Sequence, residues 1–162
     1  MNFLTTKPGA SPVIVIGTFP VSAARAYKAW TSEDEIIQWF GTEPFCVKSA
    51  SIDLSVGGCW KFIFEDTPEK TVSLQGEYIE IIPNEKLVFS WKHVTENKGE
   101  QNTSTEPSKV TVVFTELNGE TTVTLHHENI NNEDGRKGVG SGWQCSFESL
   151  QNIFKQSSGK TS

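Results

Sequence analysis

Histidine is the residue type in this chain that could most readily bind a metal ion or carry a proton near neutral pH. The three histidines are His93, His126 and His127. Successive residues of a β-strand point to opposite faces, so His126 and His127 cannot share one ion on the strand that their apolar neighbours indicate. The sequence has no H-x-x-x-H pattern, no H-E-x-x-H pattern and no closely spaced pair of cysteines. We therefore expect no metal site and no bound cofactor.

The sequence also offers no well-supported nucleophile and no well-supported acid–base group. Ser141 stands between two glycines, but no G-x-S-x-G nucleophile motif is present. Helical periodicity places Ser141 and Cys145 off the apolar face of the final helix, away from any enclosed site. Glu33, Asp34 and Glu35 fall in the first turn of an expected helix, where carboxylates usually cap the helix or stabilise its dipole. The sequence identifies no catalytic residue, and an enzyme is not the favoured interpretation.

The glycines before the last helix pose a separate question, because glycine destabilises a helix interior. The segment GVGSGWQCSFESLQNIF, residues 138–154, has its glycines too far from the preceding strand and in the wrong spacing for a dinucleotide-binding loop. Gly135, Gly138 and Gly142 form a stripe beside the apolar face. They either permit a close approach of the backbone to a neighbour or border the mouth of a cavity, and the family resemblance described below favours the first explanation.

The elements that must position these residues follow from hydrophobic periodicity. Residues 13–19 read as a strand, and residues 21–41 as two short helices, with Ser22 as one N-cap and Ser32 with Glu35 as a capping box. Residues 137–155 form one amphipathic helix. Its apolar face comprises Val139, Trp143, Phe147, Leu150, Ile153 and Phe154.

Residues 43–128 read as consecutive antiparallel strands. Alternating apolar residues indicate strands at 52–56, 60–64, 72–82, 87–91, 110–117 and 121–127. Asn118-Gly119 is a strong signal for a two-residue hairpin turn. The polar segment 95–108 reads as a connecting loop, less plausibly as a lid over a site.

Bulk composition limits the classes of partner. The 162 residues fit one domain, with 36% hydrophobic and 21% charged residues. The formal net charge of −6 and the lack of a basic cluster argue against nucleic acid and anionic membranes as partners. Three widely spaced cysteines and no signal-peptide or membrane-spanning pattern lead us to expect a cytoplasmic protein.

Five segments in order give the chain a resemblance to a known family: AYKAWTSEDEIIQWF, VGGCWKF, GEYIEIIPNEKLVFSW, LHHE and GSGW. They resemble the START-like (SRPBCC) superfamily, in the branch related to the C-terminal domain of the ATPase activator of the ninety-kilodalton heat-shock chaperone. The resemblance implies an α+β helix-grip fold, in which a curved antiparallel sheet of about six or seven strands surrounds a long C-terminal helix. It implies an N-terminal tail at 1–12, one helix-grip domain at 13–156 and a C-terminal tail at 157–162.

Many members of that superfamily bind apolar small molecules between sheet and helix. The resemblance therefore implies a pocket for a small hydrophobic or aromatic molecule, although most of the candidate side chains are expected to serve as plain core. His127 shares strand parity with Val123 and Leu125 and should face inward, as a structural histidine more readily than a ligand-binding one. The candidate pocket residues are Trp39, Phe40, Trp60, Phe62, Phe64, Phe89, Trp91, Phe114, His127, Gly138, Gly142, Trp143 and Phe147.

Two other functions remain open. The first is a protein-interaction module that regulates a chaperone ATPase. The eukaryotic activator uses a separate N-terminal module to hold the chaperone, and with 12 residues before the first expected strand we expect no such module here. The second is an enzyme, because relatives include cyclases that shape their substrate by pocket geometry. Binding of a small hydrophobic molecule is the favoured function.

Overall fold

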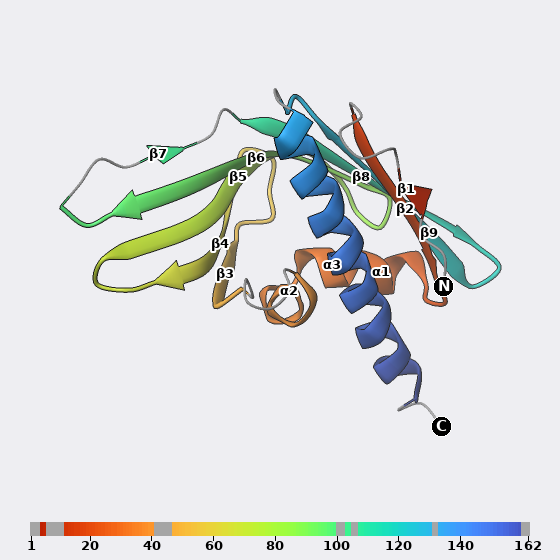
Figure 1. Cartoon of the computed structure of the whole chain (residues 1–162). Helices are drawn as coiled ribbons and strands as arrows, with labels where there is room; N and C mark the ends of the chain where they lie inside the picture. Colours follow the sequence, from red (N-terminus) through yellow and green to blue (C-terminus); the bar gives the residue numbers. More distant parts are fainter. Residues whose placement is uncertain are drawn as a thin grey trace.

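The computed structural model of the chain describes residues 4–5, 12–40, 47–99, 103–104, 107–130 and 133–159. A curved sheet holds three helices against one of its faces (Figure 1). In chain order the elements are β1 (Leu4–Thr5), β2 (Val13–Phe19), α1 (Ala23–Thr31), α2 (Glu33–Trp39), β3 (Ser49–Ile52), β4 (Cys59–Asp66), β5 (Lys70–Ile82), β6 (Lys86–Asn97), β7 (Thr103–Ser104), β8 (Ser108–Leu117), β9 (Glu120–Glu128) and α3 (Glu133–Gly159).

The sheet confirms the predicted fold class. Its strand order is β1-β2-β9-β8-β6-β5-β4-β3, with β7 paired to β6, and the described pairs are all antiparallel. The two-residue strand β1, which falls in the predicted N-terminal tail, pairs with β2 through Leu4 and Ile16. The long helix α3 lies across the sheet, as the helix-grip fold requires (Figure 1), and it continues to Gly159.

Alternation of side chains fixes which face of each strand is buried. In β2 and β9, and in β8 as far as Phe114, every second residue is buried. In β9 these residues are Thr121, Val123, Leu125 and His127. The predicted hairpin turn between β8 and β9 is confirmed, because Asn118 and Gly119 both have positive φ angles, of 55° and 80°. His127 therefore faces the core, as strand parity predicts.

Two predictions for the strands are wrong. Strand β3 ends at Ile52, and Leu54 and Val56 lie exposed in a turn instead of alternating along a strand. This turn is tied to β5 because Gly57 N–H donates to the Tyr78 carbonyl and Tyr78 N–H donates to the Gly58 carbonyl. The segment 95–108 is also more regular than a loop, since β6 continues to Asn97 and residues 103–104 form β7.

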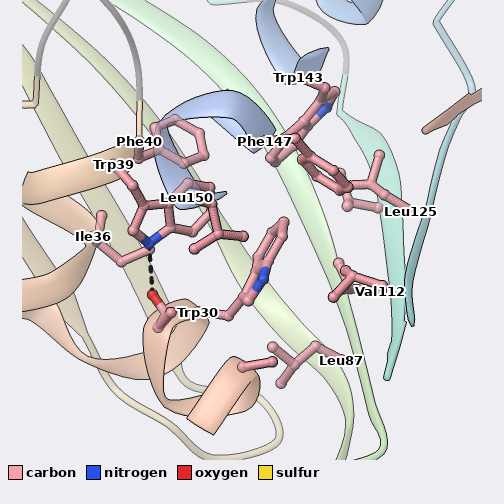
Figure 2. Close-up of a cluster of buried hydrophobic side chains, with 14 of the residues drawn as sticks. Trp30, Ile36, Trp39, Phe40, Leu87, Val112, Leu125, Trp143, Phe147 and Leu150 are labelled. Atoms are coloured by element: carbon pink, nitrogen blue, oxygen red, sulfur yellow. Dashed lines mark hydrogen bonds between the residues drawn. The ribbon is translucent and has the colours of Figure 1, made fainter. Parts of the chain in front are cut away.

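The corner between α1 and α2 is held by specific bonds. Ser22 caps α1 as predicted, its hydroxyl accepting from Arg25 N–H at 3.1 Å. The capping box predicted for α2 is wrong, because the Ser32 side chain makes no capping bond. Glu35 pairs instead with Arg25 at 2.6 Å, which draws its carboxylate toward α1. Trp39 Nε1 donates to the Ala29 carbonyl at 2.8 Å and joins the two helices (Figure 2).

Helix α3 is anchored to β2 and to the corner by aromatic rings. Phe19 of β2 contacts Phe147 and Phe154 at ring-centroid distances of 5.9 and 5.4 Å. One turn before Phe147, the ring of Trp143 stacks on Trp30 of α1 at 5.7 Å and 27°. Burial of these large rings is the main stabilisation of α3, whose opposite face is polar.

Candidate functional site

A pocket lies between the α1–α2 corner and strands β4, β5 and β6. The space within it that is open to the centre of a water molecule is about 20 Å³, enough for about one water. Aromatic and aliphatic side chains alone form its lining, and no charged group is among them. The lining residues are Trp30, Ile36, Phe40, Trp60, Phe62, Tyr78, Phe89 and Trp91.

The strands place these rings by their period of two. Trp60 and Phe62 lie two residues apart on β4, with ring centroids 4.7 Å apart. Phe89 and Trp91 occupy the same face of β6, and both contact Trp60, at 5.5 and 5.8 Å. Phe40, immediately after α2, closes the set by packing on Phe62 at 5.1 Å. The resulting wall is rich in π-faces, which suits an apolar or aromatic body.

A close backbone approach at Gly76 of β5 sets the position of Trp60. Trp60 Nε1 donates to the Ser90 carbonyl at 3.2 Å. A Cβ atom at Gly76 would lie 1.9 Å from that carbonyl oxygen and 2.7 Å from Trp60 Nε1. Only glycine permits this contact, because such distances are far inside van der Waals separation. Gly76 is therefore a residue on which the pocket depends.

Four lining residues carry a polar side-chain atom: Trp30, Trp60 and Trp91 an indole Nε1–H, and Tyr78 a hydroxyl. Burial raises the pKa of the Tyr78 hydroxyl, with a smaller contribution from Tyr27, so Tyr78 remains protonated and neutral. The indole of Trp30 is 4% exposed, and its Nε1–H has no hydrogen-bond partner within the part of the chain that the structure describes. An unsatisfied buried donor costs about 1–3 kcal/mol, so Trp30 is a feature that folding alone does not explain.

A separate buried network centres on His127, beside the pocket. Trp143 Nε1 donates to His127 Nδ1 at 3.1 Å, and His127 Nε2 lies 2.7 Å from Ser108 Oγ. Ser108 Oγ donates in turn to the Trp91 carbonyl at 3.3 Å. Because an indole N–H can only donate, Nδ1 must be the acceptor and Nε2 carries the proton. The hydrogen bonds therefore run in one direction from Trp143 to the Trp91 carbonyl.

This direction decides what the serine–histidine pair can do. A general base for Ser108 would need a free lone pair on Nε2, whereas Nε2 here is the donor. Burial lowers the pKa of His127 to about 3, so the ring stays neutral at ordinary pH. The contacts therefore favour a structural histidine, the alternative preferred from the sequence.

The structure brings together only part of the predicted site. Five of the predicted residues line the pocket: Phe40, Trp60, Phe62, Phe89 and Trp91. Trp39, Phe114, Trp143 and Phe147 are buried in the neighbouring core, where Figure 2 shows Trp39, Trp143 and Phe147 around Trp30. Phe64 is partly buried against that core, and His127 belongs to the network above.

The close-approach explanation for the helix glycines is wrong. Gly138 and Gly142 are exposed, and a Cβ added to either would meet nothing within 4 Å. Neither is among the residues that line the pocket. At the intervening Gly140 a Cβ would make only an ordinary contact with Val13, at 3.5 Å. Helical periodicity identified the stripe correctly but could not show that it faces open space.

Three lining residues escaped prediction: Trp30, Ile36 and Tyr78. Their sequence signals were present. Trp30 and Ile36 occupy the inward faces of the two short helices, and Tyr78 shares strand parity with Leu74 of β5. A helical wheel applied to residues 23–39, as well as to the last helix, would have indicated the first two.

Sequence comparison decides the family. The family described as "Activator of Hsp90 ATPase homolog 1-like protein" matches residues 20–155. The chain belongs to this family. The resemblance carried by the five sequence segments is thereby confirmed. No curated protein matches the chain.

Solved structures show the same fold for this member of the Hsp90 ATPase activator homologue-like family. The Mll3558 protein from Rhizobium loti is 22% identical, covering 94% of this chain and 99% of that one, with a TM-score of 0.67. A protein from Rhodobacter sphaeroides is 14% identical, covering 96% and 99%, with a TM-score of 0.74. CalU16 from Micromonospora echinospora is 19% identical, covering 95% and 86%, with a TM-score of 0.63. At these identities the likeness establishes the fold alone.

From the sequence we expect no metal site and no membrane-spanning segment. The described residues contain no group of three or more His, Cys, Asp or Glu side chains arranged to hold a metal ion. No helix among them is long and apolar enough to cross a membrane.

Proposed function

We propose that this protein binds a small, mainly apolar molecule in the pocket between the α1–α2 corner and strands β4–β6. The observation that carries the proposal is the lining itself, eight apolar or aromatic side chains gathered around an unfilled space. Pockets of this kind, with few polar groups, are the usual sites for small apolar ligands. Membership of a family with the START-like fold supports the same class of function.

The position of the proposed site differs from that expected from the resemblance. The candidate cavity was expected between the sheet and the C-terminal helix, but the lining residues come from α1, α2 and the strands. Trp143 of α3 contacts Phe40 and Trp91 from behind, at 5.5 and 5.2 Å. Helix α3 thus supports the wall of the proposed site.

The size of the pocket limits the ligand. Space for about one water molecule cannot admit a bulky lipid unless several rings move. The proposal is for a molecule about the size of one aromatic ring, which is larger than the unfilled space and requires the lining side chains to move apart when it binds.

The test pairs a blocking substitution with a control elsewhere in the core. α-Methylstyrene is titrated into the ¹⁵N-labelled protein, and binding is followed by the indole N–H resonances. Phe89→Trp adds atoms inside the pocket and should weaken binding at least tenfold. Phe19→Trp adds the same atoms beside Phe147, away from the pocket, and should leave affinity unchanged. Native mass spectrometry of freshly purified protein identifies any small molecule that copurifies. Absence of binding by wild-type protein in both experiments would refute the proposal.

A further inference from the structure

The unpartnered N–H group of Trp30 adds a chemical requirement to the proposed ligand. Trp30 lines the pocket, is almost fully buried, and is the lining residue whose buried side-chain donor has no partner within the described residues. Native proteins rarely leave such a group unsatisfied, because its desolvation is uncompensated. The ring is held in place by stacking on Trp143 and by an edge contact with Trp39 at 4.7 Å. Its donor therefore has a fixed direction.

Trp60 provides the internal comparison. It lines the same pocket with the same type of ring, but its Nε1–H is already used by the Ser90 carbonyl. Trp91, the third lining indole, is only partly buried. Trp30 is thus the lining indole whose N–H is both buried and without a partner among the described residues. Trp143, outside the lining, donates to His127.

We infer that the ligand of this pocket carries a neutral hydrogen-bond acceptor, such as a carbonyl oxygen, and that Trp30 Nε1–H recognises it. This inference rests on the proposed function and specifies the class of molecule. An acceptor is required because an indole N–H can only donate. A neutral acceptor fits because the lining has no cationic group to balance an anion. A cation could be held by aromatic faces, but the positive end of the N–H dipole disfavours it.

Two molecules of nearly the same shape test the inference. Acetophenone has a carbonyl oxygen where α-methylstyrene has a methylene group. The ratio of their dissociation constants is measured by NMR titration for wild type, Trp30→Phe and Trp60→Phe. Using a ratio removes the different hydration of the two probes, because hydration is the same for all three proteins.

The expected result is a ratio that moves at least fivefold toward α-methylstyrene in Trp30→Phe and stays at the wild-type value in Trp60→Phe. In wild-type protein, acetophenone should also shift the Trp30 indole proton downfield, whereas α-methylstyrene should not. This second measurement needs no variant and remains decisive if Trp30→Phe fails to fold.

Equal ratios in the three proteins, with no selective shift of the Trp30 proton, would overturn the inference. The donor would then be satisfied by a buried water that no ligand oxygen replaces. That outcome leaves the proposed function intact, because both probes still bind. Binding of α-methylstyrene without binding of acetophenone would also overturn the inference and leave the proposed function intact. Failure of both probes to bind wild-type protein, with no copurified molecule, would refute the proposed function and this inference with it.

Discussion

The Trp143 indole N–H donates to Nδ1 of His127 across 3.1 Å, and this bond joins α3 to β9. The two residues lie 16 positions apart in the chain, and both are almost fully buried. The bond fixes the neutral tautomer of the imidazole and directs its other N–H toward Ser108. A histidine bound on both sides in this way stabilises the helix–sheet contact only while it remains uncharged.

Acidification should therefore destabilise the protein through His127. Its folded-state pKa, lowered by burial to about 3, lies below the ordinary 6.5. Between these values the unfolded chain binds a proton that the folded protein does not, so stability falls as the pH falls. His127→Asn should reduce the pH dependence of the unfolding free energy by about 1 kcal/mol per pH unit between pH 5 and 6. Urea denaturation at several pH values measures this slope.

His93 supplies the control for that experiment. Burial and the nearby Lys70 also lower its pKa, but His93 is exposed overall. His93→Asn should change the slope less than His127→Asn does. An unchanged slope in His127→Asn would contradict the buried neutral imidazole.

Ser108 should be unreactive despite its 2.7 Å contact with a histidine. Its proton goes to the Trp91 carbonyl, and the neighbouring imidazole nitrogen is itself a donor. We expect a fluorophosphonate that labels activated serines to leave the wild-type protein unlabelled, as judged by intact mass. Labelling that disappears in Ser108→Ala would instead reveal an activated nucleophile and favour the enzyme hypothesis.

Replacing glycine by alanine should have opposite effects on stability at the exposed positions of α3 and at the close backbone contact in the sheet. Gly138→Ala and Gly142→Ala add a methyl group to open space in α3, so each should stabilise the protein by about 0.5–1 kcal/mol. Gly76→Ala drives a Cβ into the Ser90 carbonyl and should cost about 2 kcal/mol or more. Thermal unfolding of the three variants measures these changes in stability. A stable Gly76→Ala would show that β5 and β6 can separate without cost.

Enlarging the pocket should improve binding at the expense of stability. Phe40 packs on Phe62 and Trp91, and Phe40→Leu removes part of that wall. The change should cost roughly 1–2 kcal/mol of unfolding free energy and should tighten α-methylstyrene binding. Phe19→Leu, a similar loss beside α3, should cost as much without any gain in affinity. An unchanged affinity in Phe40→Leu would place the ligand elsewhere.

Much of the fold was predictable because alternation and helical periodicity report burial directly. The alternation of β9 predicted the inward direction of His127, and Asn118-Gly119 predicted its hairpin. Local sequence patterns gave wrong predictions where a contact with a residue distant in the sequence determines the local structure. Ser32 and Glu35 have the spacing of a capping box, but Arg25 takes the Glu35 carboxylate. Leu54 and Val56 alternate like strand residues, yet their turn is fixed by bonds to Tyr78.

The site was only half predictable for a related reason. Aromatic residues on strands were correctly identified as inward-facing, but periodicity does not distinguish a ring that lines a space from one that fills it. Trp60 and Phe114 illustrate this, since both are buried and only the first lines the pocket. The donor state of Trp30 and the clearance at Gly76 depend on atoms brought together by the tertiary fold. No local sequence pattern encodes them.

Only part of the pocket wall takes part in anchoring α3, and this has an evolutionary consequence. Helix α3 is anchored by Phe19 of β2 and by the stacking of Trp143 on Trp30. Ile36, Tyr78 and Phe89 shape other parts of the pocket. Substitutions at those three positions can alter ligand preference without disturbing the contacts that retain the helix. A protein with this architecture can therefore change the ligand preference that we propose while keeping one scaffold.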